Sequence, residues 1–401
     1  MVENGEWAFS VAREGYPNGA GVAYLTYAVI TVVVALIIIV LPIKFSYGKS
    51  TSANLSTAIA DEIFKRFSFR FFALNSVSLL VMLFGFGAIN VWTGAVSKGE
   101  FRVGLGKFGA VAYLLMKFIL PGLLAHSVLL YSESTKSSAL RFRLLGNMSL
   151  VFLFGSTWGF KSTSMFMLLP ALLLVYWNIR PATLFRLAVF SILSIVLFTY
   201  IFDSHKDTAD VFGFLLTRVT VIQGDISWYV WDLYKKGEVF PGFSRTLLAG
   251  VGDNTLSVFG VIKEDQYNWM LYHYDWMLNY VAGYPLESSA NGGNVTGTPF
   301  SEGLIAGGMT GVLTLAAIAG LIIGAFFRLL RHSLRHHKNV LGAVGSCYFC
   351  FVVFPWLNGG AVASLYHVAN LFGLAITFFF ILLLRENVFN TNEKNRVIVA
   401  S

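Results

Sequence analysis

The stretch "VAYLTYAVITVVVALIIIVLPI", residues 22 to 43, is the clearest guide to the fold because it is long and contains no charged residue. A helix needs roughly 20 apolar residues to cross the hydrocarbon core of a bilayer. Of the 401 residues in the chain, 56% are hydrophobic and only 12% are charged, whereas about 25% of the residues of an average soluble domain are charged. The sequence therefore predicts an all-α polytopic membrane protein.

Apolar windows bounded by charges or by Gly and Pro predict about 9 to 10 transmembrane helices. We place them near 22–43, 71–93, 108–131, 143–159, 163–179, 183–202, 300–327, 340–356 and 361–385. Residues 1–21 are polar and net acidic, unlike a cleavable signal peptide, so the first span is expected to be retained. A tight turn around Gly159, Phe160 and Lys161 separates the fourth and fifth spans, which we interpret as a hairpin rather than one long helix.

The basic linkers between the spans predict the orientation of the chain. By the positive-inside rule, the linkers after the first, third, fifth, seventh and ninth spans are cytoplasmic. Residues 203–299 then form one long external, periplasmic loop, which has more acids than bases. Its many Trp and Tyr residues indicate structure, in part as amphipathic helices such as 214–237. The predicted organisation is therefore N-terminal helices over 1–202, the long loop over 203–299, and C-terminal helices with a cytoplasmic tail over 300–401.

The net charge of +8 does not indicate a nucleic-acid-binding protein, because the basic residues lie in short clusters between apolar spans. Cys347 and Cys350 lie inside a helix-length apolar run, where a redox or metal role is not expected. His332 and His336 are one helical turn apart, but they lie in a basic linker and are interpreted as solvated anchors. We therefore expect no metal, no cofactor and no nucleic-acid partner.

Ionisable residues inside the third span are candidate functional residues. Lys117 lies well inside that span, and His126 lies further along it. An ionisable group within a membrane helix is costly unless it faces a cavity or a partner. In the alternative interpretation, the Lys117 side chain extends to the outer interface and keeps its charge in water.

A set of cations is predicted on the external side, where short loops usually avoid them. The set comprises Lys161, Arg218, Arg245, Arg102 and Lys107. Such a cluster at the outer mouth of a helical bundle is suited to binding phosphate, because Arg offers a planar pair of donors and Lys a point charge. The alternative is that these residues contact lipid headgroups.

The stretch "TGTPFSEGLIAGGMTGVL", residues 296 to 313, follows the long loop and opens a late span. In this arrangement the chain resembles the Wzy-type polysaccharide polymerases of O-antigen and related envelope glycans. The residues that carry the resemblance are Thr298, Pro299, Glu302, Gly303, Gly308 and Gly311. Members of this family also tend to have an Arg between mid-chain helices and an Arg at the start of the long loop. Lys161 departs from the first of these, whereas Arg218 matches the second.

The resemblance implies a metal-independent glycosyltransferase in the bacterial inner membrane. It would polymerise undecaprenyl-diphosphate-linked oligosaccharides at the periplasmic face, in a lipid bilayer and in some cases with a chain-length regulator. His273, Asp225 and Glu302 are the candidate general bases for the acceptor hydroxyl. Asn294 and Thr298 are candidate sugar contacts, although Thr298 and Glu302 also suit a plain helix start, as N-cap and first-turn acid.

Two other functions stay open. An O-antigen ligase shares the long loop and the lipid-diphosphate donor, and such ligases usually depend on an external histidine, for which His273 is available. A transporter or flippase for lipid-linked sugars belongs to a different class. Its folds commonly have paired repeats and broken helices, and the sequence indicates neither of these.

Overall fold

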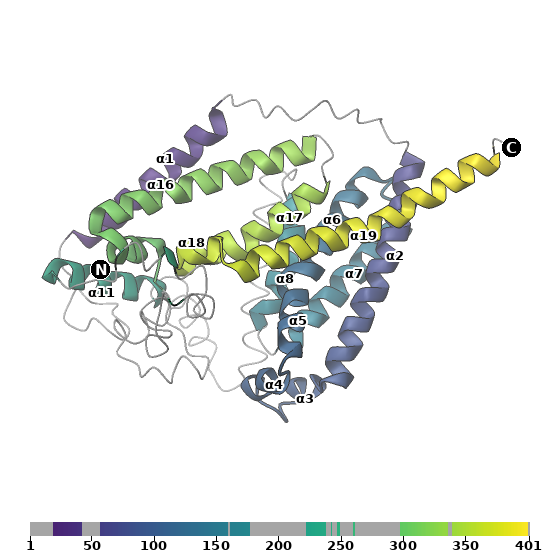
Figure 1. Ribbon diagram of the computed structural model, residues 1–401, viewed down its shortest axis with the longest axis horizontal. Helices are drawn as coiled ribbons and strands as arrows, with labels where there is room; N and C mark the ends of the chain where they lie inside the picture. Colours follow the sequence, from purple (N-terminus) through teal and green to yellow (C-terminus); the bar gives the residue numbers. More distant parts are fainter. Residues whose placement is uncertain are drawn as a thin grey trace. The chain divides into compact units, whose positions relative to one another are not determined.

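The computed structural model describes residues 19–41, 57–158, 161–176, 222–237, 242, 247–248, 260, 297–335 and 339–399. The regular elements in this part of the chain are all helices (Figure 1). Their bounds are α1 Ala20–Val40, α2 Thr57–Leu80, η2 Val81–Gly85, α3 Ile89–Trp92, α4 Lys98–Gly104, α5 Phe108–Leu114, η3 Leu115–Ile119, α6 Leu120–Glu133, α7 Ser138–Ser156, α8 Lys161–Tyr176, α11 Ile222–Lys236, α16 Pro299–Arg335, α17 Asn339–Tyr348, η7 Phe349–Val353, α18 Phe354–Gly359, η8 Val362–Leu365 and α19 Val368–Val399.

Within the described residues, 6 helical segments are long and apolar enough to cross a membrane. These segments are Ala20–Val40, Thr57–Gly85, Phe108–Glu133, Pro299–Arg335, Asn339–Gly359 and Val362–Arg385. The chain is thus an α-helical membrane protein, as predicted. The larger number of 9 to 10 spans remains a prediction, and its sixth member, 183–202, lies outside the described residues.

The second span differs from its predicted position at 71–93. Its helix begins at Thr57 and ends at Gly85, so residues expected in a cytoplasmic linker are helical. Two of their charged side chains have partners: Arg66 pairs with Glu62, one helical turn away, at 2.7 Å, and Arg70 donates to the carbonyl of Leu384 in α19 at 3.0 Å. Because these bonds satisfy charged groups at the end of a span, the helix extends beyond its apolar window.

The fourth and fifth predicted spans are separate helices, α7 and α8, as expected. A Cβ atom built on Gly155 of α7 would lie only 2.6 Å from the Cα atom of Ser164 in α8. The helices therefore approach closely next to the turn, and a continuous helix is ruled out there. Neither helix is among the 6 long apolar segments, although Thr163–Val175 is a shorter apolar helix.

The chain forms two compact units, each built from separate stretches. The first contains residues 1–43, 191–328 and 352–371, and the second contains 44–190, 329–351 and 372–401. In the second unit, α2 and α7 are joined by a pair of amide hydrogen bonds between buried residues. Asn75 Nδ2 donates to the Asn147 carbonyl at 3.3 Å, and Asn147 Nδ2 donates to the Ser68 carbonyl at 3.1 Å.

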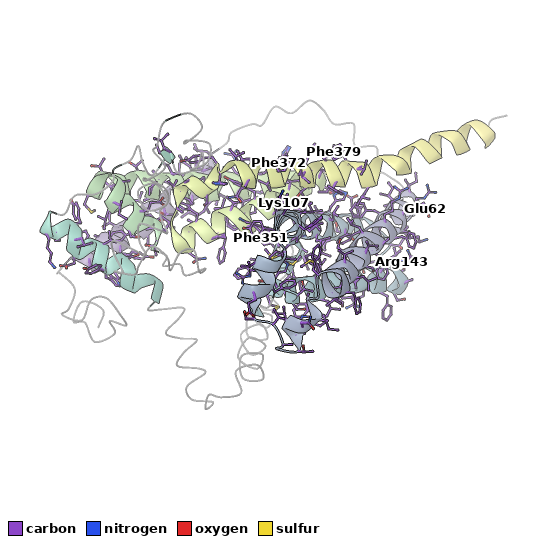
Figure 2. All side chains as sticks on the ribbon, turned by 60° about the horizontal axis from the view of Figure 1, so that its bottom comes forward. Glu62, Lys107, Arg143, Phe351, Phe372 and Phe379 are labelled. Carbon is purple, nitrogen blue, oxygen red and sulfur yellow. The ribbon has the colours of Figure 1, made fainter. Side chains whose placement is uncertain are left out.

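Large apolar side chains of the second unit also lie on its surface. Phe372 and Phe379 lie along α19, and 56% and 62% of their surfaces are exposed (Figure 2). In water such residues would favour association with another apolar surface, but in a bilayer they contact lipid chains. Their exposure is therefore consistent with a membrane-spanning α19.

In the first unit, α1 packs against α16 through small residues. A Cβ atom on Gly320 would lie 2.6 Å from the Thr31 carbonyl oxygen, and one on Gly324 would lie 2.6 Å from Ile38 Cβ. A hydrogen bond lies beside this contact: the Thr31 hydroxyl donates to the Ala316 carbonyl at 3.2 Å. Small residues let helix backbones approach closely, which is a common basis for helix association in membranes.

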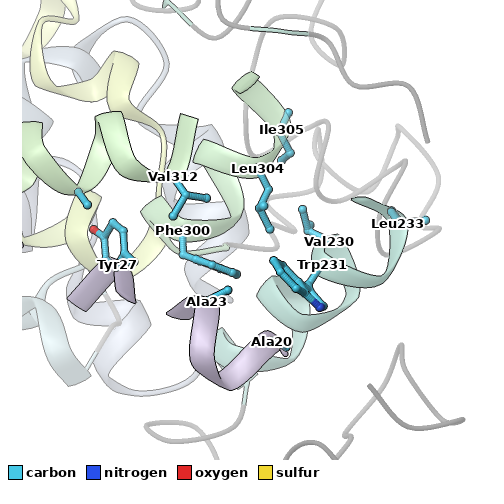
Figure 3. Close-up of a cluster of buried hydrophobic side chains, with 11 residues drawn as sticks. Ala20, Ala23, Tyr27, Val230, Trp231, Leu233, Phe300, Leu304, Ile305 and Val312 are labelled. Atoms are coloured by element: carbon cyan, nitrogen blue, oxygen red, sulfur yellow. The ribbon is translucent and has the colours of Figure 1, made fainter. Parts of the chain in front are cut away.

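The core of the first unit brings α11 to the N-terminal parts of α1 and α16 (Figure 3). Trp231 of α11 stacks on Phe300 of α16, with ring centroids 6.1 Å apart, and Tyr24 of α1 meets Phe300 edge-on at 5.3 Å. The predicted helix within 214–237 is thus present as α11. Its buried face packs on protein, through Val230, Trp231 and Leu233.

Candidate functional site

The candidate site is in the first unit and begins with a break in α16. The helical conformation is interrupted at Gly307 and Gly308. A Cβ atom on Gly303 would lie 2.6 Å from the Cα atom of Val312, although these residues would be about 13 Å apart in a straight helix. The chain therefore reverses direction at the break, and the short piece from Pro299 packs against the start of the long piece. This corrects the expectation of an unbroken span at 300–327.

Gly308 is the residue that the reversal requires. Its φ of 60° and ψ of −145° are accessible to glycine but strained for other residues. A Cβ atom there would also lie 2.9 Å from Cε2 of Tyr234 in α11. Glycine is therefore favoured at this position for two reasons: its backbone conformation is strained for other residues, and the Tyr234 ring leaves no room for a side chain.

Thr298 links the start of α16 to α11. Its hydroxyl lies 2.9 Å from Ser227 Oγ, and its backbone N–H donates to the same oxygen at 3.2 Å. Ser301 Oγ and the Glu302 N–H both donate to the Thr298 carbonyl, at 2.6 and 3.1 Å. Thr298, Ser227 and Ser301 are buried, so these bonds satisfy polar groups that would otherwise be costly. Thr298 is therefore both a helix start, as expected, and a contact to the long loop.

Glu302 is completely buried and joins α16 to the segment around α18. Its Oε1 accepts a hydrogen bond from the Val362 backbone N–H at 2.6 Å, and its Oε2 accepts one from the indole N–H of Trp356 at 3.1 Å. Trp356 is also fully buried. Each carboxylate oxygen thus has a donor from the protein. This geometry suits an anchor for the backbone at Val362, and it leaves the proposed role of Glu302 as a base without direct support.

The segment that Glu302 anchors is a second interruption of helical structure, which we call the crossover and define as residues 360–367. Gly360 and Ala361 have positive φ values of 72° and 65°, and a short 3-10 turn follows. Its last residues are Tyr366, whose hydroxyl donates to the Leu247 carbonyl in the long loop, and His367, whose Nδ1 accepts from the Ala369 N–H at 3.3 Å.

Sequence reasoning missed the crossover because it treated 361–385 as one span. The signal was the pair Gly359 and Gly360, followed by the polar residues of "SLYHVAN" inside an otherwise apolar window. Non-helical backbone at the depth of a membrane is tolerated where it is buried in protein or lines a cavity. Two such interruptions, in α16 and at the crossover, are connected through the Glu302 carboxylate.

The other predicted site residues fall into different parts of the chain. Asp225 is a residue of α11, close in sequence to Ser227, and Lys161 is the first residue of α8. The remaining residues predicted from the long loop lie outside the described residues: Arg218, Arg245, His273 and Asn294.

Arg102 lies in α4, which has a well-formed N-terminal cap. Ser97 accepts from the Glu100 N–H at 3.2 Å, and Glu100 accepts from the Ser97 N–H at 2.9 Å. These hydrogen bonds lower the pKa of Glu100 below its usual value. Burial lowers the pKa of Arg102 as well, although a guanidinium remains charged at neutral pH. Arg102 is therefore a fixed positive charge on a short ordered helix.

Lys117 and His126 lie in the predicted span, in the second unit. Lys117 belongs to the π-helical turn η3, and its Nζ lies 5.4 Å from the centre of the Tyr113 ring and 5.3 Å from that of Phe118. Such turns are frequent at functional sites, and the aromatic rings stabilise the charge. His126 is fully buried and meets Phe67 edge-on at 5.0 Å. Neither residue belongs to the unit that contains Glu302.

The described geometry is a buried, hydrogen-bonded junction between α11, the start of α16 and the crossover. Two interrupted helices meet there, and a buried carboxylate joins them through hydrogen bonds to Val362 and Trp356. Comparisons with protein-family models, curated protein sequences and solved structures found no significant match for this chain.

Proposed function

We propose that this chain is a Wzy-type polysaccharide polymerase of the bacterial inner membrane. The observation that supports it best concerns the motif of the resemblance, from Thr298 to Gly311. These residues form the folded-back start of α16. The Thr298 side chain is hydrogen-bonded to α11, and the Glu302 side chain is hydrogen-bonded to the crossover. Residues that served only as a membrane span would need none of these polar contacts.

In the proposed reaction, a growing glycan on undecaprenyl diphosphate moves to an incoming lipid-linked repeat unit. The bond between the sugar C1 and the diphosphate oxygen breaks, and its electron pair stays on the diphosphate. The acceptor hydroxyl oxygen bonds to C1 and gives its proton to a base, for which His273 and Asp225 are the candidates. Lys161 and Arg218 would stabilise the leaving diphosphate, because fixed positive charge is most effective in a partly dry site.

Contacts to the long loop support a shared outer site. Ser227 of α11 bonds Thr298, and the Leu247 carbonyl accepts from Tyr366 at the crossover. In the predicted topology, the start of α16, the crossover and the 203–299 loop all face the periplasm. Lipid-linked sugars present their diphosphate at this level of the bilayer, with the polyprenyl chain in the hydrocarbon region.

The break in α16 gives the transporter alternative a specific observation in its favour, since broken helices are common in transporters. In those folds, however, the break lies near the middle of the bilayer. The continuous piece of α16, residues 309–335, is about 40 Å long and can cross the hydrocarbon core by itself. The break is therefore at one end of the span, which favours a site at the membrane surface. A ligase would use the same surface and differs only in the acceptor.

Deletion of the gene separates the three functions through the envelope glycan that remains. Without a polymerase, single repeat units still reach the final acceptor, so a gel shows short glycan and no ladder. Without a ligase, the acceptor carries no repeat unit, and without a flippase the lipid-linked units accumulate on the cytoplasmic side. A full-length ladder in the deletion strain would contradict the proposal.

A further inference from the structure

We propose that the junction between α2 and α7 binds an anionic phospholipid, whose phosphate contacts Lys65 and Arg143 and whose acyl chain lies over Gly146. The inference does not depend on the proposed function, and it concerns residues of the second unit only. We call this surface the α2–α7 seam. It is defined by Lys65, Phe69 and Phe72 of α2 and by Phe142, Arg143 and Gly146 of α7.

The helices α2 and α7 run parallel and side by side. Near the start of α2, Asp61 accepts hydrogen bonds from the backbone N–H and the hydroxyl of Thr135, which shortly precedes α7, at 2.8 and 2.7 Å. About three turns further along, a Cβ atom on Gly146 would lie 4.0 Å from Cε2 of Phe72. Both pairs are 74 positions apart in the chain, so the two helices advance together from the same end of the unit.

The charged residues of the seam lie on the faces that meet at this contact. Residues spaced by three or four positions share one face of a helix. On α2 this spacing runs from Lys65 through Phe69 to Phe72, and on α7 Arg143 lies three positions before Gly146. Because Phe72 and Gly146 meet, the two faces form one continuous surface. Both cations are exposed on it, and Arg143 is labelled in Figure 2.

The apolar part of the seam suits an acyl chain. Phe69, Phe72 and Phe142 are 66%, 45% and 76% exposed. Among the described residues, only Phe72 would come within 4 Å of a Cβ atom on Gly146, and at 4.0 Å this is an ordinary contact. At Gly320, in contrast, α1 fills the space beside the glycine. Three exposed aromatic rings therefore flank a position where a hydrocarbon chain has room to lie against the backbone of α7.

The acidic residues closest to Lys65 in α2 are bound to other partners. Asp61, one turn away, uses both carboxylate oxygens to accept from Thr135, and Glu62 pairs with Arg66 at 2.7 Å. The positive charge of the seam is thus suited to an anion from outside the protein. Arg and Lys between membrane helices commonly bind the headgroups of anionic lipids.

The length of the span places these charges at the level of lipid headgroups. The apolar helical segment Thr57–Gly85 has 29 residues and is about 43 Å long, whereas the hydrocarbon core is about 30 Å thick. Its charged start therefore extends beyond the core, while Phe72 and Gly146 lie deeper. In the predicted topology this end faces the cytoplasm, on the opposite side from the proposed glycan site, so the ligand is a membrane phospholipid and not the glycan donor.

Substitutions test the headgroup and chain contacts separately. Lys65→Gln and Arg143→Gln remove one charge each and keep a polar side chain; because both residues are exposed, the fold should not change. Gly146→Leu fills the position of the acyl chain, and its Cβ atom has space within the protein. Lys107→Gln is the matched control, since it removes an exposed cation of the same unit outside the seam.

The experiment uses native mass spectrometry to measure binding of phosphatidylglycerol and phosphatidylcholine, with identical acyl chains, to the purified full chain in detergent. We expect the wild type to prefer phosphatidylglycerol. Lys65→Gln and Arg143→Gln should each weaken phosphatidylglycerol binding about fivefold and leave phosphatidylcholine binding unchanged, whereas Gly146→Leu should weaken binding of both lipids. All variants should keep the lipid-free unfolding temperature.

Three results would overturn the inference and leave the proposed function intact. The first is equal affinity of the wild type for the two lipids. The second is an equal loss of phosphatidylglycerol binding in Lys107→Gln, which would show attraction to net charge alone. The third is unchanged binding in the two Gln variants, which decide the outcome by themselves if Gly146→Leu is poorly folded.

Discussion

Tyr234 lies directly against Gly308, with Cε2 of its ring 2.9 Å from the position of a Cβ atom on that glycine. The ring therefore occupies the space beside the reversal of α16. Because α11 carries Tyr234 and also bonds Thr298 through Ser227, one helix contacts both the start and the end of the folded-back piece. The reversal is thus supported from outside α16 as well as by its own backbone.

Replacement of Gly308 by Ala should destabilise the protein. The positive φ is strained for Ala, and the added methyl group meets Tyr234, so we expect a loss of about 1–3 kcal/mol in the free energy of unfolding. The measurement is denaturant unfolding of purified protein in mild detergent. Gly109→Ala is the matched control, because Gly109 lies in α5 and a Cβ atom there has only an ordinary contact at 3.5 Å. Equal stability of the two variants would contradict the proposed strain.

Glu302→Gln should lower the free energy of unfolding by about 1–3 kcal/mol. The amide keeps only one acceptor oxygen, and its NH2 group is placed against an N–H donor. Trp356→Phe removes only the indole donor and leaves the bond to Val362. A double-mutant cycle between these substitutions measures the coupling, which we expect to be at least about 0.5 kcal/mol. If the effects of the two substitutions on the free energy of unfolding are additive, the hydrogen bond between Trp356 and Glu302 does not contribute to stability.

Gly320→Val should separate α1 from α16, because its side chain would overlap the Thr31 carbonyl and the Val34 side chain. The expected result is a lower unfolding temperature and faster proteolysis after α1. Leu321→Ala provides the control, since Leu321 is adjacent but 46% exposed. If both variants resist protease like the wild type, the small residues do not form the contact that holds α1.

The N-terminal cap of α4 should weaken in acid. The pKa of Glu100 is lowered in the folded protein, so its contribution is present above the usual pKa of a Glu side chain and is lost as the pH falls through the lowered value. The protection of α4 against amide hydrogen exchange, measured relative to the intrinsic exchange rate at each pH, should therefore fall at low pH. Ser97→Ala keeps the bond from the residue 97 backbone N–H, which is the main cause of the lowered pKa of Glu100, and removes the side-chain acceptor for the Glu100 N–H, so the pKa should return only part of the way to its ordinary value and the protection of α4 should already be lower at neutral pH. An unchanged exchange profile in that variant would argue against the cap.

Arg218→Ala should nearly abolish glycan polymerisation without loss of folded protein, if this residue holds the donor diphosphate. Loss of one charge-assisted contact should cost about 2–4 kcal/mol of transition-state stabilisation, which is roughly 30-fold to several hundred-fold in rate. Arg218→Lys should recover activity only in part because the paired donors are absent. Lys161→Arg, in contrast, should remain active. Wild-type product length from purified Arg218→Ala would exclude the role.

The sequence was a good guide to features that depend on local composition. Long apolar runs predicted the membrane helices, and the turn at Gly159 predicted the separation of α7 from α8. It was a poor guide to features that depend on distant partners. The bonds of Glu302 reach residues 54 and 60 positions further along the chain, and no periodicity indicates such contacts. The reversal at Gly307 and Gly308 was likewise missed, because the span was expected to run unbroken over 300–327.

The side-chain amide of Asn75 donates to the Asn147 carbonyl, and the side-chain amide of Asn147 donates to the Ser68 carbonyl, which has a consequence for how α2 and α7 can move. Sliding one helix by a single residue would shift it by about 1.5 Å and turn the side chain by about 100°, so both bonds would break together. Ser68, Asn75 and Asn147 are buried, so an intermediate position would leave buried amide groups without these partners, which is costly. These two hydrogen bonds therefore oppose a change of register between α2 and α7.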